Sequence, residues 1–297
     1  MTISGDDQYL YLYSDREATI QRFALPGLTP DLQIVAPGSV YDVKAAPGAA
    51  RTIAVSIDRQ NSPNSPAEAV LIYDDAVPRP NTVPWFFGFS VFTPDLSWGE
   101  DATLLFGRNS SSSDYALYYF SVTPNGVAST RTHIHPTSIG GRGILYDRTS
   151  KLLYLGNGLG DTQMVDPVKD LWAGSLDAPG LTLADPTTNK AFQLFYTQGP
   201  SSLQPQATIA SFDLNTHNLI EAISFTQNYA GIGPRLIRYG ADGLAFLRAE
   251  GIFLVNGDFV TGRPAAPTGG PDAPAVSTVS GQRVVVVDAL ANDLVAD

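Results

Sequence analysis

Hydrophobic residues in this chain occur in short runs that are separated by turn-forming residues. Segment 236–255 shows the pattern most clearly, because its runs LIRY, LAFL and IFLV are joined by Ala-Asp-Gly and Glu-Gly. Short apolar runs between such residues predict antiparallel strands joined by hairpins. No stretch of the sequence sustains the 3.6-residue hydrophobic period of an amphipathic helix. The pattern therefore predicts a β-meander in this segment and an all-β fold with little helix for the chain.

The opening strand of this meander recurs along the chain. Comparable short strands that soon end in a turn begin at Met1, Asp42, Asp95, Gly143, Leu181, Leu236 and Asp293. Second strands are predicted at 9–13, 52–57, 103–106, 152–155, 191–196 and 244–247, and third strands at 18–23, 69–73, 116–122, 161–165, 208–213 and 252–255. The starts lie about 40 to 55 residues apart, a spacing typical of four-stranded propeller blades.

The repeat predicts a β-propeller of six four-stranded blades, with seven blades as the alternative. A large β-sandwich would also contain short strands and regular turns, but it does not usually repeat a whole four-strand unit. Residues 1–297 are accordingly treated as a single propeller domain, in which we expect the polar segments 58–68 and 108–115 to be loops.

The C-terminal part of the chain interrupts the pattern. Segment 262–274, GRPAAPTGGPDAP, predicts an extended linker within the last blade, because segment 282–288, QRVVVVD, again has the pattern of a strand. We expect a C-terminal strand within 282–297 to lie close to residues 1–13, because pairing strands from the two ends would close the ring and remove an exposed edge.

The amino-acid composition argues against several classes of partner and site. The net charge is −11, with 18 Lys and Arg against 29 Asp and Glu, which argues against nucleic acid or an anionic membrane as a partner. The chain has no cysteine, so it has neither a disulfide framework nor a thiolate zinc site. No segment has the length of a membrane-spanning helix, and the N-terminus lacks the pattern of a signal peptide. We expect a monomer without membrane insertion.

Three sequence phrases carry a resemblance to a known family. They are YDDAVPRPN at 73–81, RYGADGLAF at 238–246 and NDLVAD at 292–297. These phrases resemble recurring pieces of bacterial lactonase-like β-propellers, whose order is similar over most of residues 1–260. The resemblance implies a propeller fold and a secreted or cell-surface parent protein. It also implies a hydrolase activity less directly, because fold alone does not determine function.

The aligned strand starts give the main candidate site. Innermost strands of a propeller begin at one mouth of its central channel, so Asp42, Asp95 and Asp293 are expected to converge there, with Asn292 beside Asp293. Crowded carboxylates raise one another's pKa unless a cation joins them. Oxygen ligands of this kind suit Ca²⁺ or another divalent cation better than zinc. Alternatively, Arg142 and Arg235, which precede two other strand starts, neutralise the carboxylates without a metal ion.

Histidine offers a second candidate metal site. His133 and His135 are spaced i, i+2, so on a strand they would share one face and could supply two ligands. The third histidine of the chain, His217, would have to meet them to complete a zinc site. The alternative is that His133 and His135 are exposed on an outer strand that ends at Pro136.

Two function classes are compatible with these observations. The first is a non-catalytic binding or scaffold propeller from an extracellular bacterial protein, which presents its channel mouth to a small molecule, a glycan or a protein. The second is a metal-dependent hydrolase of lactones, aryl esters or phosphotriesters. In that enzyme Asp42, Asp95, Asp293, Arg142 and Arg235 would be the catalytic candidates, and a divalent cation would polarise the C=O or P=O group. No complete catalytic set of a lactonase can be matched onto the chain, so the binding class is favoured.

Overall fold

The computed structural model describes most of the chain. The described residues are 1–13, 17–25, 27–58, 68–84, 86–87, 90–91, 94–109, 116–134, 143–156, 161–178, 181–185, 187–198, 205–226, 236–239, 242–248, 251–262, 276–279 and 282–287. Two compact units are present, Met1–Leu155 with Met164–Ala173, and Gly156–Gln163 with Gly174–Asp297. They are described separately below.

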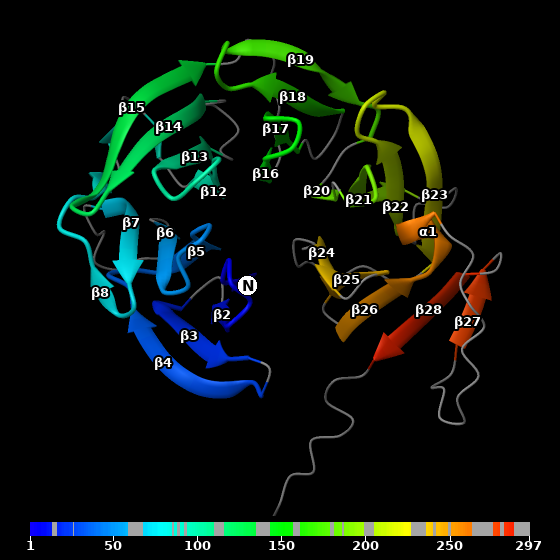
Figure 1. Ribbon diagram of the computed structural model, residues 1–297, viewed down its shortest axis with the longest axis horizontal. Helices are drawn as coiled ribbons and strands as arrows, with labels where there is room; N and C mark the ends of the chain where they lie inside the picture. Colours follow the sequence, from blue (N-terminus) through cyan, green and yellow to red (C-terminus); the bar gives the residue numbers. More distant parts are fainter. Residues whose placement is uncertain are drawn as a thin grey trace, which may run out of the picture. The chain divides into compact units, whose positions relative to one another are not determined.

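Six successive antiparallel sheets, each a meander in sequence order, form the blades of a β-propeller in the part of the chain that the structure describes (Figure 1). Blade 1 contains β1 (Thr2–Ile3), β2 (Tyr9–Tyr13), β3 (Thr19–Ala24) and β4 (Thr29–Val35). Blade 2 contains β5 (Val40–Ala45), β6 (Thr52–Ile57), β7 (Glu68–Asp74) and β8 (Val77–Pro78), and β9 (Val83–Pro84) also pairs with β7. A separate two-stranded sheet joins β10 (Phe86–Phe87) and β11 (Ser90–Val91).

The next three blades each have four strands. Blade 3 contains β12 (Pro94–Trp98), β13 (Leu104–Asn109), β14 (Ala116–Thr123) and β15 (Gly126–Ile134). Blade 4 contains β16 (Ile144–Asp147), β17 (Leu152–Leu155), β18 (Thr162–Asp166) and β19 (Leu171–Leu176). Blade 5 contains β20 (Leu181–Asp185), β21 (Lys190–Gln198), β22 (Pro205–Asp213) and β23 (Leu219–Thr226).

Blade 6 contains β24 (Leu236–Tyr239), β25 (Gly243–Arg248), β26 (Gly251–Asn256), β28 (Gln282–Val287) and, outermost, β27 (Val276–Val279). The six blades confirm the predicted all-β propeller over the sandwich and the seven-bladed alternative. The short helix α1 (Asp258–Thr261) is the only α-helix among the described residues, and none of their helices is long and apolar enough to cross a membrane.

The C-terminal strand takes a place other than the expected one near the N-terminus. β28 lies between β26 and β27 within blade 6, as the interpretation of segment 262–274 as a linker within that blade implied. Blade 1 meanwhile is complete with four strands from the N-terminal part of the chain alone. The expected pairing with residues 1–13 is therefore not made by Gln282–Val287, because both edges of β28 are already occupied. The end of the chain, which includes Asn292 and Asp293, lies outside the described residues.

Each unit has its own hydrophobic core. In the first unit, side chains such as Tyr11, Ile34, Val55 and Leu96 from blades 1 to 3 form one cluster. Phe106, Tyr119, Leu153 and Val165 join blades 3 and 4 in another. In the second unit, aromatic side chains of blades 5 and 6 pack with α1, namely Phe192, Phe246, Phe253 and Phe259. Strands in the middle of a blade are buried on both faces, as all six residues of β6 are, so they carry nearly continuous apolar residues, whereas the outer strand β4 is mostly exposed.

The hairpin turns follow a common local rule that the sequence encodes. An aspartate at the end of one strand accepts hydrogen bonds from the backbone N–H groups two and three residues later, as Asp147, Asp166 and Asp213 do. The residue four positions after the aspartate then has a left-handed backbone. These residues are Lys151 (φ 60°), Asp170 (φ 58°) and His217 (φ 60°). Hairpin geometry thus fixes His217 in a tight turn of blade 5.

Candidate site at the inner strands

Asp42 lies on β5 and is buried, with 5% of its surface exposed. Its Oδ1 atom accepts hydrogen bonds from the Val43 backbone N–H (2.9 Å) and the Tyr13 hydroxyl (3.2 Å). Its Oδ2 atom accepts one from the Leu96 N–H (2.9 Å) and faces the Lys44 Nζ atom at 3.5 Å. Because Leu96 belongs to β12, this carboxylate joins the inner strands of blades 2 and 3.

Asp95 occupies the corresponding place on β12. Its Oδ2 atom accepts a hydrogen bond of 2.9 Å from the backbone N–H of Gly143, directly before β16. Within the described residues, Oδ1 has no hydrogen-bond partner. Burial and the nearby charge of Asp42 raise the pKa of Asp95 to about 6, although the Gly143 N–H, Lys44 and Arg108 act in the opposite direction.

Arg108 completes the contact with blade 4. It lies opposite Asp95 in the β12–β13 pairing, is 5% exposed, and donates from Nη1 to the Gly143 carbonyl oxygen at 3.0 Å. Burial lowers the pKa of Arg108 to about 10, against the favourable charge of Asp95. Asp95 and Arg108 therefore bind the N–H and the C=O of the same residue, Gly143, whose φ of 105° disfavours a side chain.

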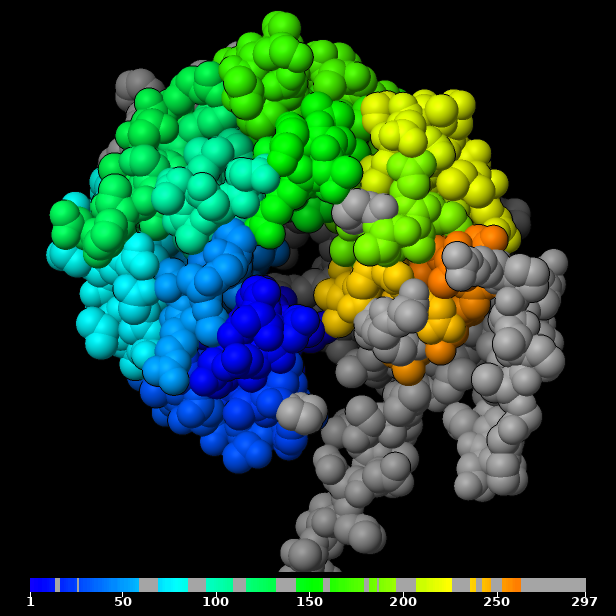
Figure 2. Space-filling model, in the orientation of Figure 1, coloured from blue at the N-terminus to red at the C-terminus, as the bar shows by residue number. Residues whose placement is uncertain are grey.

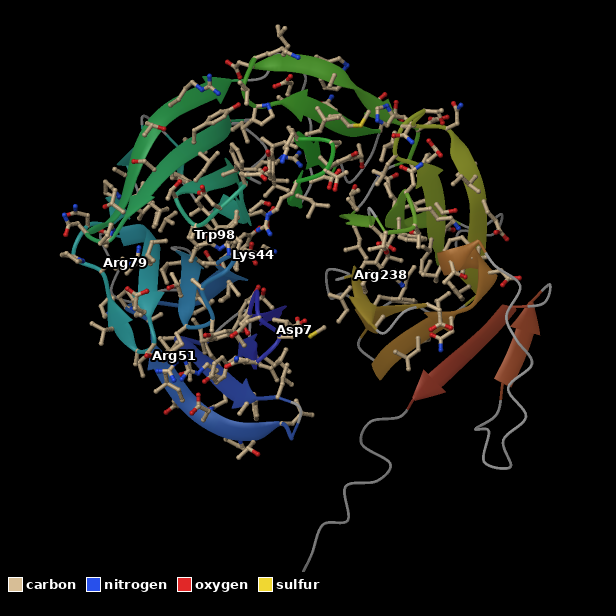
Figure 3. All side chains as sticks on the ribbon, viewed as in Figure 1. Asp7, Lys44, Arg51, Arg79, Trp98 and Arg238 are labelled. Carbon is tan, nitrogen blue, oxygen red and sulfur yellow. The ribbon has the colours of Figure 1, made fainter. Side chains whose placement is uncertain are left out.

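The structure brings two of the predicted site residues together. Asp42 and Asp95 interact electrostatically, and each accepts a backbone N–H from the next blade, Asp42 from Leu96 of β12 and Asp95 from Gly143 directly before β16. Asp293, Asn292, Arg142 and Arg235 lie outside the described residues. The positive charges beside the two carboxylates are instead Lys44 and Arg108, and Figure 3 shows Lys44 with Trp98 close to the inner strands.

Sequence reasoning missed Arg108 because it placed this residue at the start of a polar loop. The prediction for 108–115 is wrong at this end, since β13 continues to Asn109. The strand continues because Arg108 pairs with Asp95 across the hairpin, although neither residue is apolar. A signal was available: an antiparallel hairpin from Asp95 through the Gly-Glu-Asp turn brings residues of equal distance from the turn together.

The histidine candidates do not come together in the described structure. The backbone of His133 pairs with Leu117 on β15, and His135 lies outside the described residues. His217 is held in the blade 5 turn, where its N–H donates to the Asp213 carbonyl at 2.8 Å. Over the residues that the structure describes, no group of three or more His, Cys, Asp or Glu side chains is arranged to hold a metal ion.

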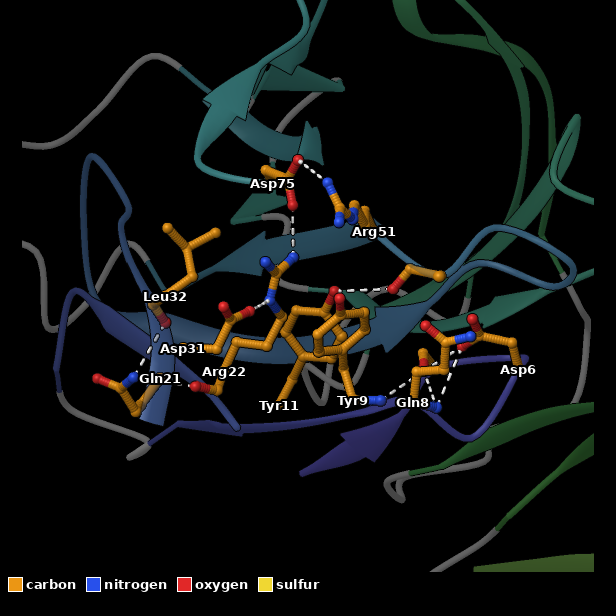
Figure 4. Close-up of polar contacts among 12 residues, drawn as sticks. Asp6, Gln8, Tyr9, Tyr11, Gln21, Arg22, Asp31, Leu32, Arg51 and Asp75 are labelled. Carbon is orange, nitrogen blue, oxygen red and sulfur yellow. Dashed lines mark hydrogen bonds and ion pairs between the residues drawn. The ribbon is translucent and has the colours of Figure 1, made fainter. Parts of the chain in front are cut away.

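A second set of polar contacts joins blades at their outer turns. In blade 1, the buried Arg22 side chain donates from Nε to Asp31 (2.6 Å) and from Nη1 to Asp75 (2.5 Å) in the β7–β8 turn (Figure 4). Its guanidinium lies 4.3 Å from the centre of the Tyr9 ring, a cation–π contact. Burial lowers the pKa of Arg22, but its hydrogen bonds to Asp75, Tyr11 and Asp31 outweigh this effect and raise it, so the side chain stays charged.

Similar contacts, in which a cationic side chain of one blade donates to the next blade, recur elsewhere. Arg79 of blade 2 donates to the Thr123 carbonyl of blade 3 at 2.7 Å. Arg131 of blade 3 donates to the Pro167 carbonyl of blade 4 at 2.8 Å and stacks on Tyr119. In the second unit, the buried Lys190 of blade 5 donates to the Phe259 carbonyl of α1 at 2.8 Å. A cation of one blade thus binds the outer turn or helix of the next.

The two sets differ in what they can do chemically. The outer cations are bound to carboxylates and carbonyls and have no feature of a reactive site. Asp95 combines burial with a pKa of about 6, so it can exchange a proton near neutral pH. No protein-family model matches this chain, and no curated protein matches its sequence. The site is therefore interpreted from its own geometry.

Proposed function

We propose that the chain is a non-catalytic binding or scaffold β-propeller. One observation carries this proposal: the buried Asp42 carboxylate already accepts hydrogen bonds from two backbone N–H groups and the Tyr13 hydroxyl, and it faces Lys44. A carboxylate that is hydrogen-bonded to two inner strands has a structural role. The resemblance to propellers of secreted bacterial proteins supports an extracellular setting for this role.

The ligand surface in this proposal is the start of the inner strands. Asp95 supplies a hydrogen-bond acceptor there, and the joined strands β5, β12 and β16 supply a rigid frame. Rigid positioning lowers the entropy lost when a partner binds. The chemistry that suits an acceptor of this kind is a hydroxyl or ammonium group, as carried by a glycan, a small molecule or a protein side chain.

A hydrolase is the second candidate, and the raised pKa of Asp95 favours it. A carboxylate with a pKa of about 6 accepts a proton from an attacking water more readily than an ordinary aspartate. The substrates would be lactones, aryl esters or phosphotriesters, and a divalent cation such as Ca²⁺, when bound, would polarise the C=O or P=O group. Asp42 does not fit the role of a ligand to that cation, because coordination would displace its hydrogen bonds to two strands.

One experiment separates the two candidates. The purified chain is analysed for bound metal and then assayed on a panel of lactones, aryl esters and phosphotriesters with and without a chelator. Two variants accompany it: Asp95→Asn, and as a control Asp101→Asn, whose carboxylate caps an exposed turn of the same blade. The binding role predicts no turnover by any of the three. Turnover that is lost in Asp95→Asn and kept in Asp101→Asn would establish the hydrolase instead.

A further inference from the structure

The fourth strand of blade 6 reaches its place by a different route from the fourth strands of other blades. In blades 1, 3, 4 and 5 the fourth strand follows the third through a short turn, as β15 follows β14 between Thr123 and Gly126. In blade 6 the chain leaves β26 at Asn256, forms α1, passes through segment 263–275 and then returns as β27 and β28. The order in the sheet is β26, β28, β27 (Figure 1). β27 and β28 therefore form a separate hairpin that is added to the edge of this blade.

The edge of β26 that receives the hairpin is positioned by other parts of the second unit. β26 pairs with β25 along its whole length on the opposite side. Phe253 and Val255 of β26 are buried in one core cluster with Phe259 and Val260 of α1. Lys190 of blade 5 fixes the end of this helix through the Phe259 carbonyl oxygen, and Figure 2 shows the orange atoms of α1 against the yellow atoms of blade 5. These contacts do not involve the hairpin, so the edge of β26 remains in place when the hairpin leaves it.

The backbone pairing between β26 and β28 has a defined register. Five residue pairs join the strands, from Ile252 opposite Val287 to Asn256 opposite Arg283. The two sequences, GIFLVN and QRVVVV, contain no proline and are rich in residues that favour strands. When a strand is added to a sheet edge, main-chain hydrogen bonds supply most of the affinity. This pairing is the same whether β28 comes from the same chain or from a second copy.

The connection to the hairpin has the composition of a spacer. Segment 263–275 reads RPAAPTGGPDAPA, and Pro- and Gly-rich sequences of this kind join elements without fixing their geometry. A segment of this length spans roughly 45 Å when fully extended, which is enough for the hairpin to reach another molecule. A strand on such a spacer competes for its own blade with an effective concentration in the millimolar range. Pairing within one chain therefore prevails in dilute solution, and exchange becomes measurable as the protein concentration approaches that range.

We propose that the β27–β28 hairpin is a strand-exchange element, which in two copies of this chain pairs reciprocally with β26 of the other copy. The partner is a second copy because it carries the matching β28 and the same register. The exchanged dimer contains the same strand pairs as two separate chains, so it needs no new surface. An open chain does not remain single at these concentrations, because GIFLVN carries neither proline nor charge and an edge of this kind favours pairing.

Disulfide trapping between two copies tests the proposal. The chain contains no cysteine, so introduced cysteines report one contact. One copy carries Leu254→Cys and the other Val285→Cys, at positions that lie opposite each other in the β26–β28 pairing and within reach of a disulfide. The two variants are mixed at millimolar concentration, diluted and oxidised. The expected product is a dimer in which a disulfide joins residues 254 and 285, identified by the mass of the linked peptides, with a yield that rises with the concentration of mixing.

Two controls make the result specific. Val284→Cys replaces Val285→Cys in the first; residue 284 lies opposite Val255, and its side chain points to the other face of the sheet, so the yield should fall about tenfold or more. The second is a single chain that carries both Leu254→Cys and Val285→Cys, which should form the disulfide internally in dilute solution. An internal disulfide without any link between mixed copies would overturn the proposal, as would equal yields from Val284→Cys and Val285→Cys. Absence of the internal disulfide would overturn the register and the proposal with it.

Discussion

The first unit joins neighbouring blades in two regions that use opposite charges. Beside the inner strands, Asp42 and Asp95 accept backbone N–H groups from the next blade. At the outer turns, Arg22 and Arg131 donate to the turn of the next blade. The outer carboxylates Asp31 and Asp75 remain 36% and 40% exposed, so water shares in their solvation. In the inner pair, Asp42 is only 5% exposed, and its charge acts on Asp95.

This difference explains the raised pKa of Asp95. At the outer turns, guanidinium groups and partly hydrated carboxylates compensate each other. At the inner strands, burial and the neighbouring charge of Asp42 raise the pKa of Asp95 to about 6, although Lys44 and Arg108 oppose this rise. Outer contacts therefore serve stability, whereas the inner pair combines stability with a group that can respond to a ligand or to pH. The four predictions below test this division.

The largest effect is expected at Gly126, which belongs to the outer contact between blades 2 and 3. Its φ is 126°, and a Cβ atom added there would lie 2.0 Å from the Asn81 carbonyl oxygen. Gly126→Ala should lower the free energy of unfolding by about 3 kcal/mol or more, because strain and overlap add. Urea denaturation measures the loss. Gly48→Ala is the control, since φ is 68° but nothing lies within 4 Å, and it should cost about 1 kcal/mol.

Arg22→Ala should have the next largest effect. Removing the guanidinium leaves Asp31, Asp75 and the Tyr9 ring without their shared partner, and loss of a buried ion pair costs about 3 kcal/mol. The matched control is Arg51→Ala, whose side chain is 62% exposed and 3.6 Å from Asp75, for which a loss below about 1 kcal/mol is expected. Equal losses in the two variants, measured by urea denaturation, would show that burial does not set the strength of the outer contact.

The inner aspartates could be predicted from the sequence, because the strand starts repeat along the chain and can be aligned. Aligning the strand starts placed Asp42 and Asp95 at equivalent positions, and each of them accepts a backbone N–H from the next blade. The outer cations could not be predicted in this way, because Arg22 and Asp75 are far apart in sequence and follow no shared spacing. Arg108 was missed because a polar sequence after β13 masks its pairing with Asp95. β27 was missed because it follows directly on the Pro- and Gly-rich segment, although the pair Ser280-Gly281 in the sequence marks a turn before β28.

Asp42→Asn tests the inner contact, in which the Asp42 carboxylate joins β5 and β12. An amide has one oxygen, so its NH₂ group must face either the Leu96 N–H or the Val43 N–H, and two donors then oppose each other. An unsatisfied buried donor costs about 2 kcal/mol, and the free energy of unfolding at pH 8 should fall by that order. An unchanged value would mean that Asp42 does not hold β5 and β12 together.

Asp95→Asn should have the smallest effect at neutral pH and the opposite sign. The carboxyl of Asp95 has a folded-state pKa of about 6, above its ordinary value of 3.8. Between these two values the folded state binds more protons than the unfolded state, so this group makes the protein more stable as the pH falls from above 6 towards 4. Above pH 6 its charge costs at most about 3 kcal/mol, and less where water reaches it.

The asparagine carbonyl can still accept the Gly143 N–H, while the repulsion from Asp42 is gone. We therefore expect Asp95→Asn to be about 1 to 2 kcal/mol more stable than the wild type at pH 8, and the two proteins to converge near pH 4. Thermal melts of both proteins at pH 4 to 8 measure the difference in their stability. The contributions of the other carboxylates are the same in both proteins and cancel in this difference. A variant that is less stable than the wild type at pH 8 would show that Asp95 and Arg108 form a stabilising ion pair. The inner contacts would then stabilise the fold in the same way as the outer ones.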